Sequence, residues 1–247
     1  MDIIRVENLK LHYSLEAGIK KAIDDITLEI KKGFTVITGP SGSGKSSFIQ
    51  MIGGLKKPTG GSINVNGTDL SIFNEEDLAT FRRRYIGFIF RQYNLLPALN
   101  VYENIVFPLG LDGRIEDREY IKQIAGLLGI EDKLYCYPKA LSSGERQKVS
   151  IARALSTKPA VILADEPTGN LDSREAQEVI GLLKMTCREF NQTVVLVTHE
   201  KEIADMADQV IFLKDGKIAD MERRQKNYVR KKMCNDKKTG KSEYYRT

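Results

Sequence analysis

The chain has 247 residues and a formal net charge of +5, and its length suffices for one large α/β domain or two small ones. No apolar run approaches the roughly 20 residues that span a bilayer, and no secretory signal opens the chain, so we expect any membrane role to come through a separate partner. The cysteines Cys136, Cys187 and Cys234 are widely separated and there are only two histidines, which favours a reduced, cytoplasmic protein without disulfides or a structural metal.

The first part of the chain reads as extended structure. Residues 3–32 alternate between apolar and polar side chains, which predicts half-exposed antiparallel strands. A second extended stretch, residues 62–65, ends in the turn Asn66-Gly67.

A glycine-rich loop follows the short apolar run 34–38, at the point where a helix near 45–53 is expected to begin. Glycines let successive N–H groups point inward at an anion, and the helix adds the positive end of its dipole. The lysine of the pattern G-x-x-x-x-G-K-S reaches β- and γ-phosphates, and the serine hydroxyl after it ligates Mg²⁺. The sequence therefore predicts ATP or GTP binding by Gly39, Pro40, Ser41, Gly42, Ser43, Gly44, Lys45, Ser46 and Ser47.

The middle of the chain is predicted to be mainly helical. A charged helix is expected over about 74–84 with Asn74 as its N-cap, and residues 87–90 are again extended. From 101 to about 138 the periodicity is helical, broken by Pro108 and Gly113. We interpret residues 74–158 as a helical insertion within one continuous domain.

Small residues mark a second helix N-terminus in the segment 141–147, before the helical run 149–156. Such a terminus is a second anion-binding device. Because one ATP has a single γ-phosphate, two such devices in one chain need an explanation.

Two later runs, 161–164 and 194–197, are almost wholly apolar, as expected of parallel strands covered on both faces. Asp165 and Glu166 end the first run, where ligands of open α/β sheets bind. Asp165 is placed to support Mg²⁺ directly or through water, and Glu166 to polarise the water that attacks the γ-phosphorus. His199 follows the second run, as a structural histidine or as a phosphate contact.

The end of the chain is predicted to be a hairpin over about 210–218 and then a basic tail. Residues 222–247 hold ten Lys/Arg and three Asp/Glu, a net charge of +7, whereas residues 1–221 hold 28 and 30, a net charge of −2. Such a tail is either a solvated flexible end or a contact for anionic lipid or nucleic acid. We expect a flexible tail, no nucleic-acid partner, and anionic lipid as the ligand to test.

Taken together, the loop 39–47, the segment 141–147, the run 161–172 and His199 resemble ABC-type ATPases in order and spacing, over roughly residues 1–220. The resemblance implies an α/β fold, a P-loop ATPase domain over 1–221 with an antiparallel β subdomain and a helical subdomain. It also implies a head-to-tail homodimer, or a paired ATPase subunit, in which ATP lies between the loop of one subunit and the 142–147 signature of the other. This arrangement accounts for both anion sites.

Roles for single residues follow from the same resemblance. It implies that Tyr13 stacks on adenine, that Asp172 lies across the dimer seam, that Ser142 and Gly144 contact phosphate, and that His199 grips the γ-phosphate. The implied catalytic residues are Glu166, His199 and Lys45, and the implied ligands are ATP and Mg²⁺, the ion held by Ser46 and Asp165.

Finer features are similar to one branch of that family: residues 87–90, 94–97, 103–104 and 164–172 look like the ATPases of macrolide exporters, lipoprotein-release systems and antimicrobial-peptide resistance pumps. Those ATPases drive separate permeases from the inner face of the membrane. The resemblance implies a permease docking near 88–110, where Leu95, Leu96 and Leu99 fit either a partner groove or a local core.

Two positions depart from the family pattern. The family has glutamine after Phe90, and this chain has Arg91, with Gln92 one place later. A guanidinium cannot ligate a cation, so either Gln92 takes over the contact with Mg²⁺ or the metal site is altered. The family usually has glycine at Ser143, and the added side chain is expected to weaken ATP-driven dimerisation.

The sequence therefore predicts the ATPase of an ABC transporter, with export of, or resistance to, a peptide antibiotic or related amphiphile as the expected process. The alternative is a non-transport ATPase that acts with a membrane partner in cell division or cell-wall regulation.

Overall fold

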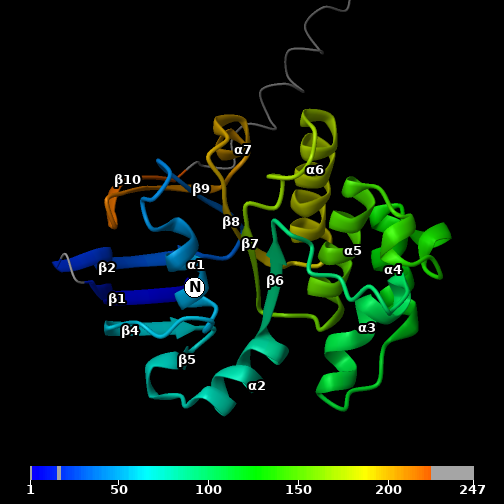
Figure 1. Cartoon of the computed structure of the whole chain (residues 1–247), viewed down its shortest axis with the longest axis horizontal. Helices are drawn as coiled ribbons and strands as arrows, with labels where there is room; N and C mark the ends of the chain where they lie inside the picture. The colour runs from blue at the N-terminus through cyan, green and yellow to red at the C-terminus, as the bar shows by residue number, and fades with distance from the viewer. Residues whose placement is uncertain (1, 16–17, 224–247) are drawn as a thin grey trace, which may run out of the picture.

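The computed structural model describes residues 2–15 and 18–223, and its strands form two sheets (Figure 1). The smaller is an antiparallel sheet in the order β2-β1-β4-β5. Its strands are β1 (Asp2–Leu15), β2 (Gly18–Lys31), β4 (Gly60–Val65) and β5 (Thr68–Asp69). The larger sheet has the order β10-β9-β3-β8-β7-β6. Its strands are β3 (Phe34–Thr38), β6 (Ile86–Phe90), β7 (Val161–Asp165), β8 (Thr193–Val197), β9 (Gln209–Lys214) and β10 (Lys217–Arg223).

Helices fill the space between and beside the sheets. The α-helices are α1 (Lys45–Ile52), α2 (Glu75–Tyr85), α3 (Val101–Leu111), α4 (Arg118–Leu128), α5 (Ser143–Ser156), α6 (Ser173–Glu189) and α7 (Lys201–Asp205). Short 3₁₀ turns are η1 (Leu70–Ile72), η2 (Glu131–Lys133) and η3 (Pro138–Ala140). Within the described residues, no helix combines the length and the apolar character that a bilayer crossing needs.

The antiparallel sheet confirms the alternating pattern of the first residues. β1 pairs with both β2 and β4, and its inward-facing side chains are buried, as the pair Val6 and Leu28 shows. Asn66 and Gly67 both have positive φ, 52° and 82°, which is the turn that an Asn-Gly pair favours between strands β4 and β5.

In the large sheet, β6, β7, β8, β3 and β9 are parallel, and β10 closes it as an antiparallel edge. The apolar runs of β7 and β8 are buried on both faces, as predicted. Because the carboxyl ends of parallel strands meet at one edge, the segments after β3, β6, β7 and β8 converge there. This convergence positions the site.

Two apolar cores lie on opposite faces of the large sheet. α1 contributes Phe48 and Ile52 to the core between the sheets. The other core is formed mainly by α3, α4, α5 and α6, which appear to the right of the sheet in Figure 1. β6 falls within the predicted insertion 74–158 and joins the large sheet beside β7.

The prediction that Pro108 breaks the helix after residue 101 was wrong. α3 continues through Pro108 to Leu111. A proline removes one intrahelical donor and crowds the carbonyl four residues earlier. Here Ile105 lies in the core where α3 packs on α5, and Leu109, directly after the proline, is also buried. This packing offsets the loss. Gly113, with φ of 65°, does follow the helix end as expected.

Other local predictions are confirmed. Asn74 is the N-cap of α2, its side chain accepting from the Asp77 N–H at 2.9 Å. The closing hairpin is β9 and β10 around Asp215-Gly216. Cys136 is half-buried and Cys187 is buried, with its thiol donating to the Gln192 carbonyl at 3.0 Å; Cys234 lies outside the described residues. The predicted basic tail lies outside the described residues, except for the first two residues, which end β10.

Candidate functional site

The loop between β3 and α1 can be built only with glycine at two places. Gly39 and Gly44 have φ of 146° and 101°. A Cβ on Gly39 would lie 1.9 Å from the carbonyl oxygen of Leu213, and one on Gly44 would lie 2.4 Å from that of Ala22. The loop is therefore wedged between β9 and β2, and its curl is the one that the glycine pattern predicted.

Lys45 points back into this loop. Its Nζ donates to the carbonyl oxygens of Gly39, at 2.9 Å, and Pro40, at 2.7 Å, and the side chain is buried. Burial lowers the pKa of the ammonium, and the nearby carboxylates of Glu166 and Asp165 oppose that shift. The other predicted loop residues surround it: Pro40, Ser41, Gly42 and Ser46 are exposed, Gly44 and Ser47 are half-buried, and Ser43 is buried.

Ser46 and Asp165 form the pair that was predicted to hold a metal. The Ser46 hydroxyl donates to Asp165 Oδ1 at 2.9 Å, across 119 positions of sequence. Burial raises the pKa of Asp165, the Glu166 carboxylate adds to the rise, and the Ser46 hydroxyl and Lys45 oppose it. A hydroxyl and a carboxylate so placed are oxygen ligands of the kind that Mg²⁺ takes, and a divalent cation would relieve the partly desolvated charge. The residues present thus fit a magnesium nucleotide.

Glu166 lies one residue further along, with a positive backbone φ of 46°, and its carboxylate lies near two basic side chains. Arg91 Nη1 lies 3.4 Å from Glu166 Oε2, and His199 Nδ1 lies 3.7 Å from Glu166 Oε1. Glu166 N–H donates to the Val197 carbonyl, which ties the segment to β8. Glu166 and His199 therefore meet, as the topology required, at the carboxyl edge of the sheet.

Arg91 makes more contacts here than its sequence position suggested. Nε donates to Asn170 Oδ1 at 3.1 Å and Nη2 to the Gly169 carbonyl at 3.0 Å, while Asn170 Nδ2 donates to the Arg91 carbonyl at 2.9 Å. The arginine therefore fastens β6 to the segment after Glu166. Gln92 is exposed, and its side chain makes no hydrogen bond within the described part of the chain.

The second predicted anion device is the first turn of α5. Ser142 is the N-cap and forms a capping box with Glu145: its hydroxyl accepts from the Glu145 N–H at 3.1 Å, and Glu145 Oε2 accepts from the Ser142 N–H at 2.8 Å. Gly144 is buried, and its N–H points at the carboxylate of Glu175. Ser143 also donates to Glu175.

The remaining predicted residues lie apart from that centre. Tyr13, in β1, is half-buried; Lys56 Nζ donates to its hydroxyl at 2.7 Å and lies 5.3 Å from its ring centre. Asp172 is exposed and is the N-cap of α6, accepting from the Glu175 N–H at 2.8 Å.

The segment between β6 and α3 is organised by Asn104, whose role the sequence analysis missed. This fully buried side chain accepts from the Leu96 N–H and donates to the carbonyls of Leu96, Leu99 and Asn100. An asparagine inside an apolar helical stripe was the available signal, because a buried amide needs several partners.

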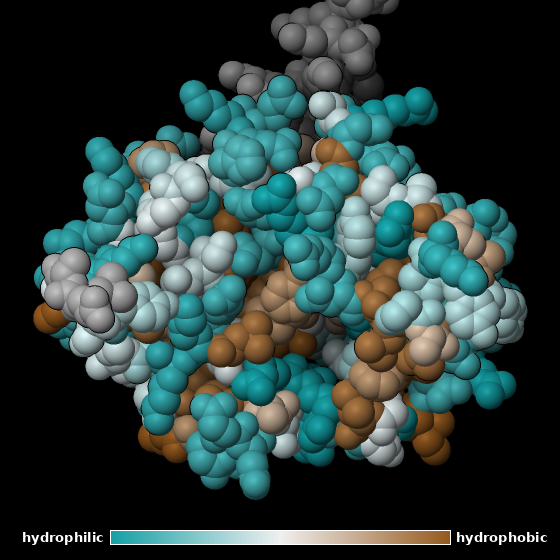
Figure 2. All heavy atoms as spheres, viewed as in Figure 1, coloured by the Kyte–Doolittle hydropathy of each residue, from teal (hydrophilic) through white to brown (hydrophobic). Residues whose placement is uncertain are grey.

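Apolar side chains remain accessible around this segment. Leu96, Phe107 and Leu111 are exposed, whereas Leu95 and Leu99 are half-buried, Leu95 against the helical core. Figure 2 shows apolar residues gathered over α3 and in the hollow between β6 and α3. Of the three leucines expected to fit a partner groove or a local core, Leu96 alone is exposed.

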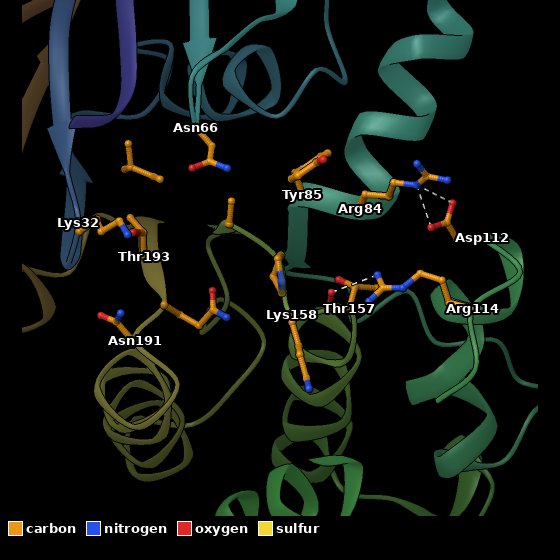
Figure 3. Close-up of a pocket in the computed structure, with 14 residues that line it drawn as sticks. Lys32, Asn66, Arg84, Tyr85, Asp112, Arg114, Thr157, Lys158, Asn191 and Thr193 are labelled. Carbon is orange, nitrogen blue, oxygen red and sulfur yellow. Dashed lines mark hydrogen bonds and ion pairs between the residues drawn. The ribbon is translucent and has the colours of Figure 1, made fainter. Parts of the chain in front are cut away.

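A wide hollow of about 680 Å³ lies at the opposite edge of the large sheet (Figure 3). Its lining includes residues that precede β3, β6, β7 and β8, among them Lys32, Tyr85 and Gln192. Two of its basic side chains are engaged: Arg84 pairs with Asp112 at 2.9 Å, and Arg114 donates to the Thr157 carbonyl. The side chains predicted to bind and hydrolyse the nucleotide lie together at the carboxyl edge and not in this hollow.

Two comparisons place this site in a family. The sequence profile of the family described as "ABC transporter" matches residues 23–169. The chain is 40% identical over 222 residues to the lipoprotein-releasing system ATP-binding protein LolD 1 of Chlorobium chlorochromatii, covering 88% of this chain and 90% of that protein. It is 38% identical over 221 residues to the bacitracin export ATP-binding protein BceA of Halalkalibacterium halodurans, covering 88% and 87%.

A solved structure agrees. The dimeric post-hydrolysis state of the ATP-binding cassette MJ0796 of Methanocaldococcus jannaschii, bound to ADP and Pi, superposes with a TM-score of 0.81 at 35% identity, over 90% of this chain and 99% of that one. The chain therefore belongs to the ABC transporter family, as an ATP- and Mg²⁺-binding ATPase subunit of an exporter-type system.

Proposed function

We propose that the chain dimerises on ATP and uses hydrolysis to drive a separate permease, in export of or resistance to a peptide antibiotic or related amphiphile. The contact that supports the ATPase site best is the Ser46–Asp165 pair beside Lys45 and Glu166. The similarity to BceA, whose name states bacitracin export, supports the substrate class.

The roles within one subunit follow from the geometry. Bound Mg²⁺ would supply charge neutralisation on the phosphates, held by Ser46 and Asp165. Lys45 would leave its carbonyl partners and donate to β- and γ-phosphate oxygens. Glu166 would orient the attacking water and accept its proton, with His199 beside it holding the γ-phosphate.

The second subunit would complete the site. In the proposed sandwich, Ser142 and Gly144 of one copy would face the γ-phosphate bound by the loop 39–47 of the other, and Asp172 would lie at the seam. Tyr13 would stack on adenine once its ring is free of the Lys56 contact. Gln92 would have to rotate inward to reach Mg²⁺, because Arg91 holds the position before it.

The permease would dock on the surface around 88–110, through Leu96 and Phe107. Such docking would hold the ATPase domain, residues 1–221 with its helical subdomain at about 74–158, on the inner face of the cell membrane. The basic tail 222–247 would add contact with anionic lipid, and truncation after Arg223 should then reduce binding to anionic vesicles.

The test compares ATP hydrolysis and size in ATP for the wild type and Glu166→Gln, with the exposed Glu202→Gln as the matched control. We expect hydrolysis to fall by roughly a hundredfold or more in Glu166→Gln alone, with an ATP-held dimer on sizing chromatography. A Glu166→Gln variant that hydrolyses ATP like the control contradicts the proposed role of this residue.

The substrate class has its own test. Cells that carry Glu166→Gln in place of the wild-type chain should lose resistance to bacitracin and keep normal lipoprotein release. Retained resistance with defective cell separation would instead point to the mechanotransmission role.

A further inference from the structure

Glu175 occupies the anion-binding end of α5 in its own subunit. Its Oε2 accepts from the Ser143 hydroxyl at 2.8 Å, and its Oε1 accepts from the Gly144 N–H at 3.2 Å. A Cβ on Gly144 would approach Oε1 to 2.9 Å, so the carboxylate lies directly against this backbone.

This contact is not the one that the local sequence favours. Asp172 and Glu175 have the spacing of a capping box, in which the glutamate would turn back to the N-cap backbone. Glu103 on α3 and Glu145 on α5 do make that return contact. Glu175 gives only its backbone N–H to Asp172, and its carboxylate crosses to α5 instead.

The Glu175 carboxylate lies at two helix N-termini: it contacts the first turn of α5 and belongs to the first turn of its own helix, α6. Among the described residues it forms no ion pair with lysine, arginine or histidine. Its partners are one hydroxyl and one helix N–H, in the first turn of a 14-residue helix whose dipole favours an anion there. The Ser142 hydroxyl is already engaged in the capping box with Glu145. The Glu175 carboxylate takes the Ser143 hydroxyl and the Gly144 N–H, which are the donors that a phosphate at this helix end would need.

We propose that Glu175 is an intramolecular competitor of nucleotide at the signature: it fills the anion site of α5, and ATP bound to the second subunit must displace it before the dimer closes. This inference rests on the proposed sandwich. Ser143 strengthens the competitor, because its hydroxyl supplies the shorter of the two bonds. The chain would then need more ATP-bound subunit to dimerise than it would without this carboxylate.

The test uses the full chain in the Glu166→Gln background, where ATP persists, and measures the subunit concentration at half-dimerisation by sedimentation in ATP. Glu175→Gln keeps the shape of the side chain and removes its charge. Glu178→Gln is the matched control, because Glu178 also links α6 to α5, through Lys148 at 2.6 Å, one turn away from the signature.

We expect Glu175→Gln to lower the half-dimerisation concentration by on the order of tenfold, as loss of one partly screened charge repulsion predicts, and Glu178→Gln to leave it within roughly twofold. Ser143→Gly should lower it by a smaller factor, which keeps the test decisive if Glu175→Gln folds poorly. ATP affinity of the dilute monomer should not change in any variant, because Glu175 does not contact the loop 39–47.

The two kinds of failure are distinguishable. If Glu175→Gln and Ser143→Gly dimerise at the same concentration as the parent or at a higher one, the competitor role is overturned and the sandwich stands. Binding of ATP without dimerisation in the parent and in every variant overturns the sandwich itself, and the competitor role with it.

Discussion

The Asp165 carboxylate is partly desolvated, and its charged form therefore lowers the stability of the folded protein. Burial raises its pKa above the ordinary 3.8. Between the two pKa values, the folded state therefore keeps a proton that the unfolded chain has released. The carboxylate therefore favours folding most below pH 3.8, and this contribution is lost as the pH rises through the folded-state pKa. At neutral pH, the charged group destabilises the nucleotide-free protein.

Asp165→Asn should for this reason raise the melting temperature of the nucleotide-free protein at pH 7, by about 2 °C. The amide still accepts from the Ser46 hydroxyl, so packing is preserved. Differential scanning fluorimetry from pH 7 to 4 should show the gain shrinking as the pH falls. A gain that grows at low pH would contradict the burial argument. Added Mg²⁺ and ATP should stabilise the wild type more than the variant.

The contacts of Arg91 lead to a testable prediction about the ATPase rate. Its guanidinium holds both Glu166 and the Gly169–Asn170 segment, so the base is engaged before water arrives. Arg91→Gln should release the carboxylate and raise the ATPase rate about tenfold, which corresponds to about 1.4 kcal/mol of barrier. The Mg²⁺ concentration for half-maximal activity should fall.

Arg83→Gln is a suitable control, since Arg83 pairs with Asp112 at 3.1 Å, away from the site. Steady-state kinetics over a Mg²⁺ series would measure both effects. If the Arg91→Gln enzyme has an unchanged ATPase rate and Mg²⁺ dependence, the arginine only connects the end of β6 to the Gly169–Asn170 segment.

At the scale of elements, α3 and the segment before it behave as one unit because Asn104 bonds to both. Asn104→Ala leaves the Leu96 N–H and several carbonyls without their partner and should cost about 2 kcal/mol of unfolding free energy. Urea denaturation would show this as a lower midpoint. Gln123→Ala, on the exposed face of α4, should change the midpoint little. Equal midpoints for the two variants would mean that the amide network adds no net stability.

The elements themselves were largely predictable from sequence. Alternation located β1 and β2, unbroken apolar runs located β7 and β8, and the glycine pattern located the loop before α1. These signals are local, so sequence carries them. Pro108 misled because tertiary packing on α5 overrides a local rule. The partners of Arg91 and Glu175 depend on side-chain contacts between segments distant in sequence, which no local pattern encodes.

At the scale of the whole molecule, the large sheet separates two edges of different character. The carboxyl edge gathers the phosphate loop, Asp165, Glu166 and His199, whereas the basic hollow of Figure 3 lies at the amino edge.

Lys32→Ala and Lys158→Ala, both in the hollow, should therefore leave the KM for ATP within roughly twofold, while Lys45→Ala should abolish measurable ATP binding. Isothermal titration with ATP and steady-state kinetics would check both statements. A large rise in KM for Lys32→Ala would show that nucleotide reaches the amino edge.

The wedging of the phosphate loop between two strands means that its shape is held from outside as well as from within. Gly216 N–H donates to the Ser43 carbonyl at 3.1 Å, and Asp24 N–H donates to the Gly216 carbonyl at 2.9 Å. The tip of the β9–β10 hairpin thus bridges the loop and the antiparallel sheet. Any shift of the loop on taking up phosphate must be absorbed by both sheets together, so we expect the β9–β10 hairpin to move when nucleotide binds.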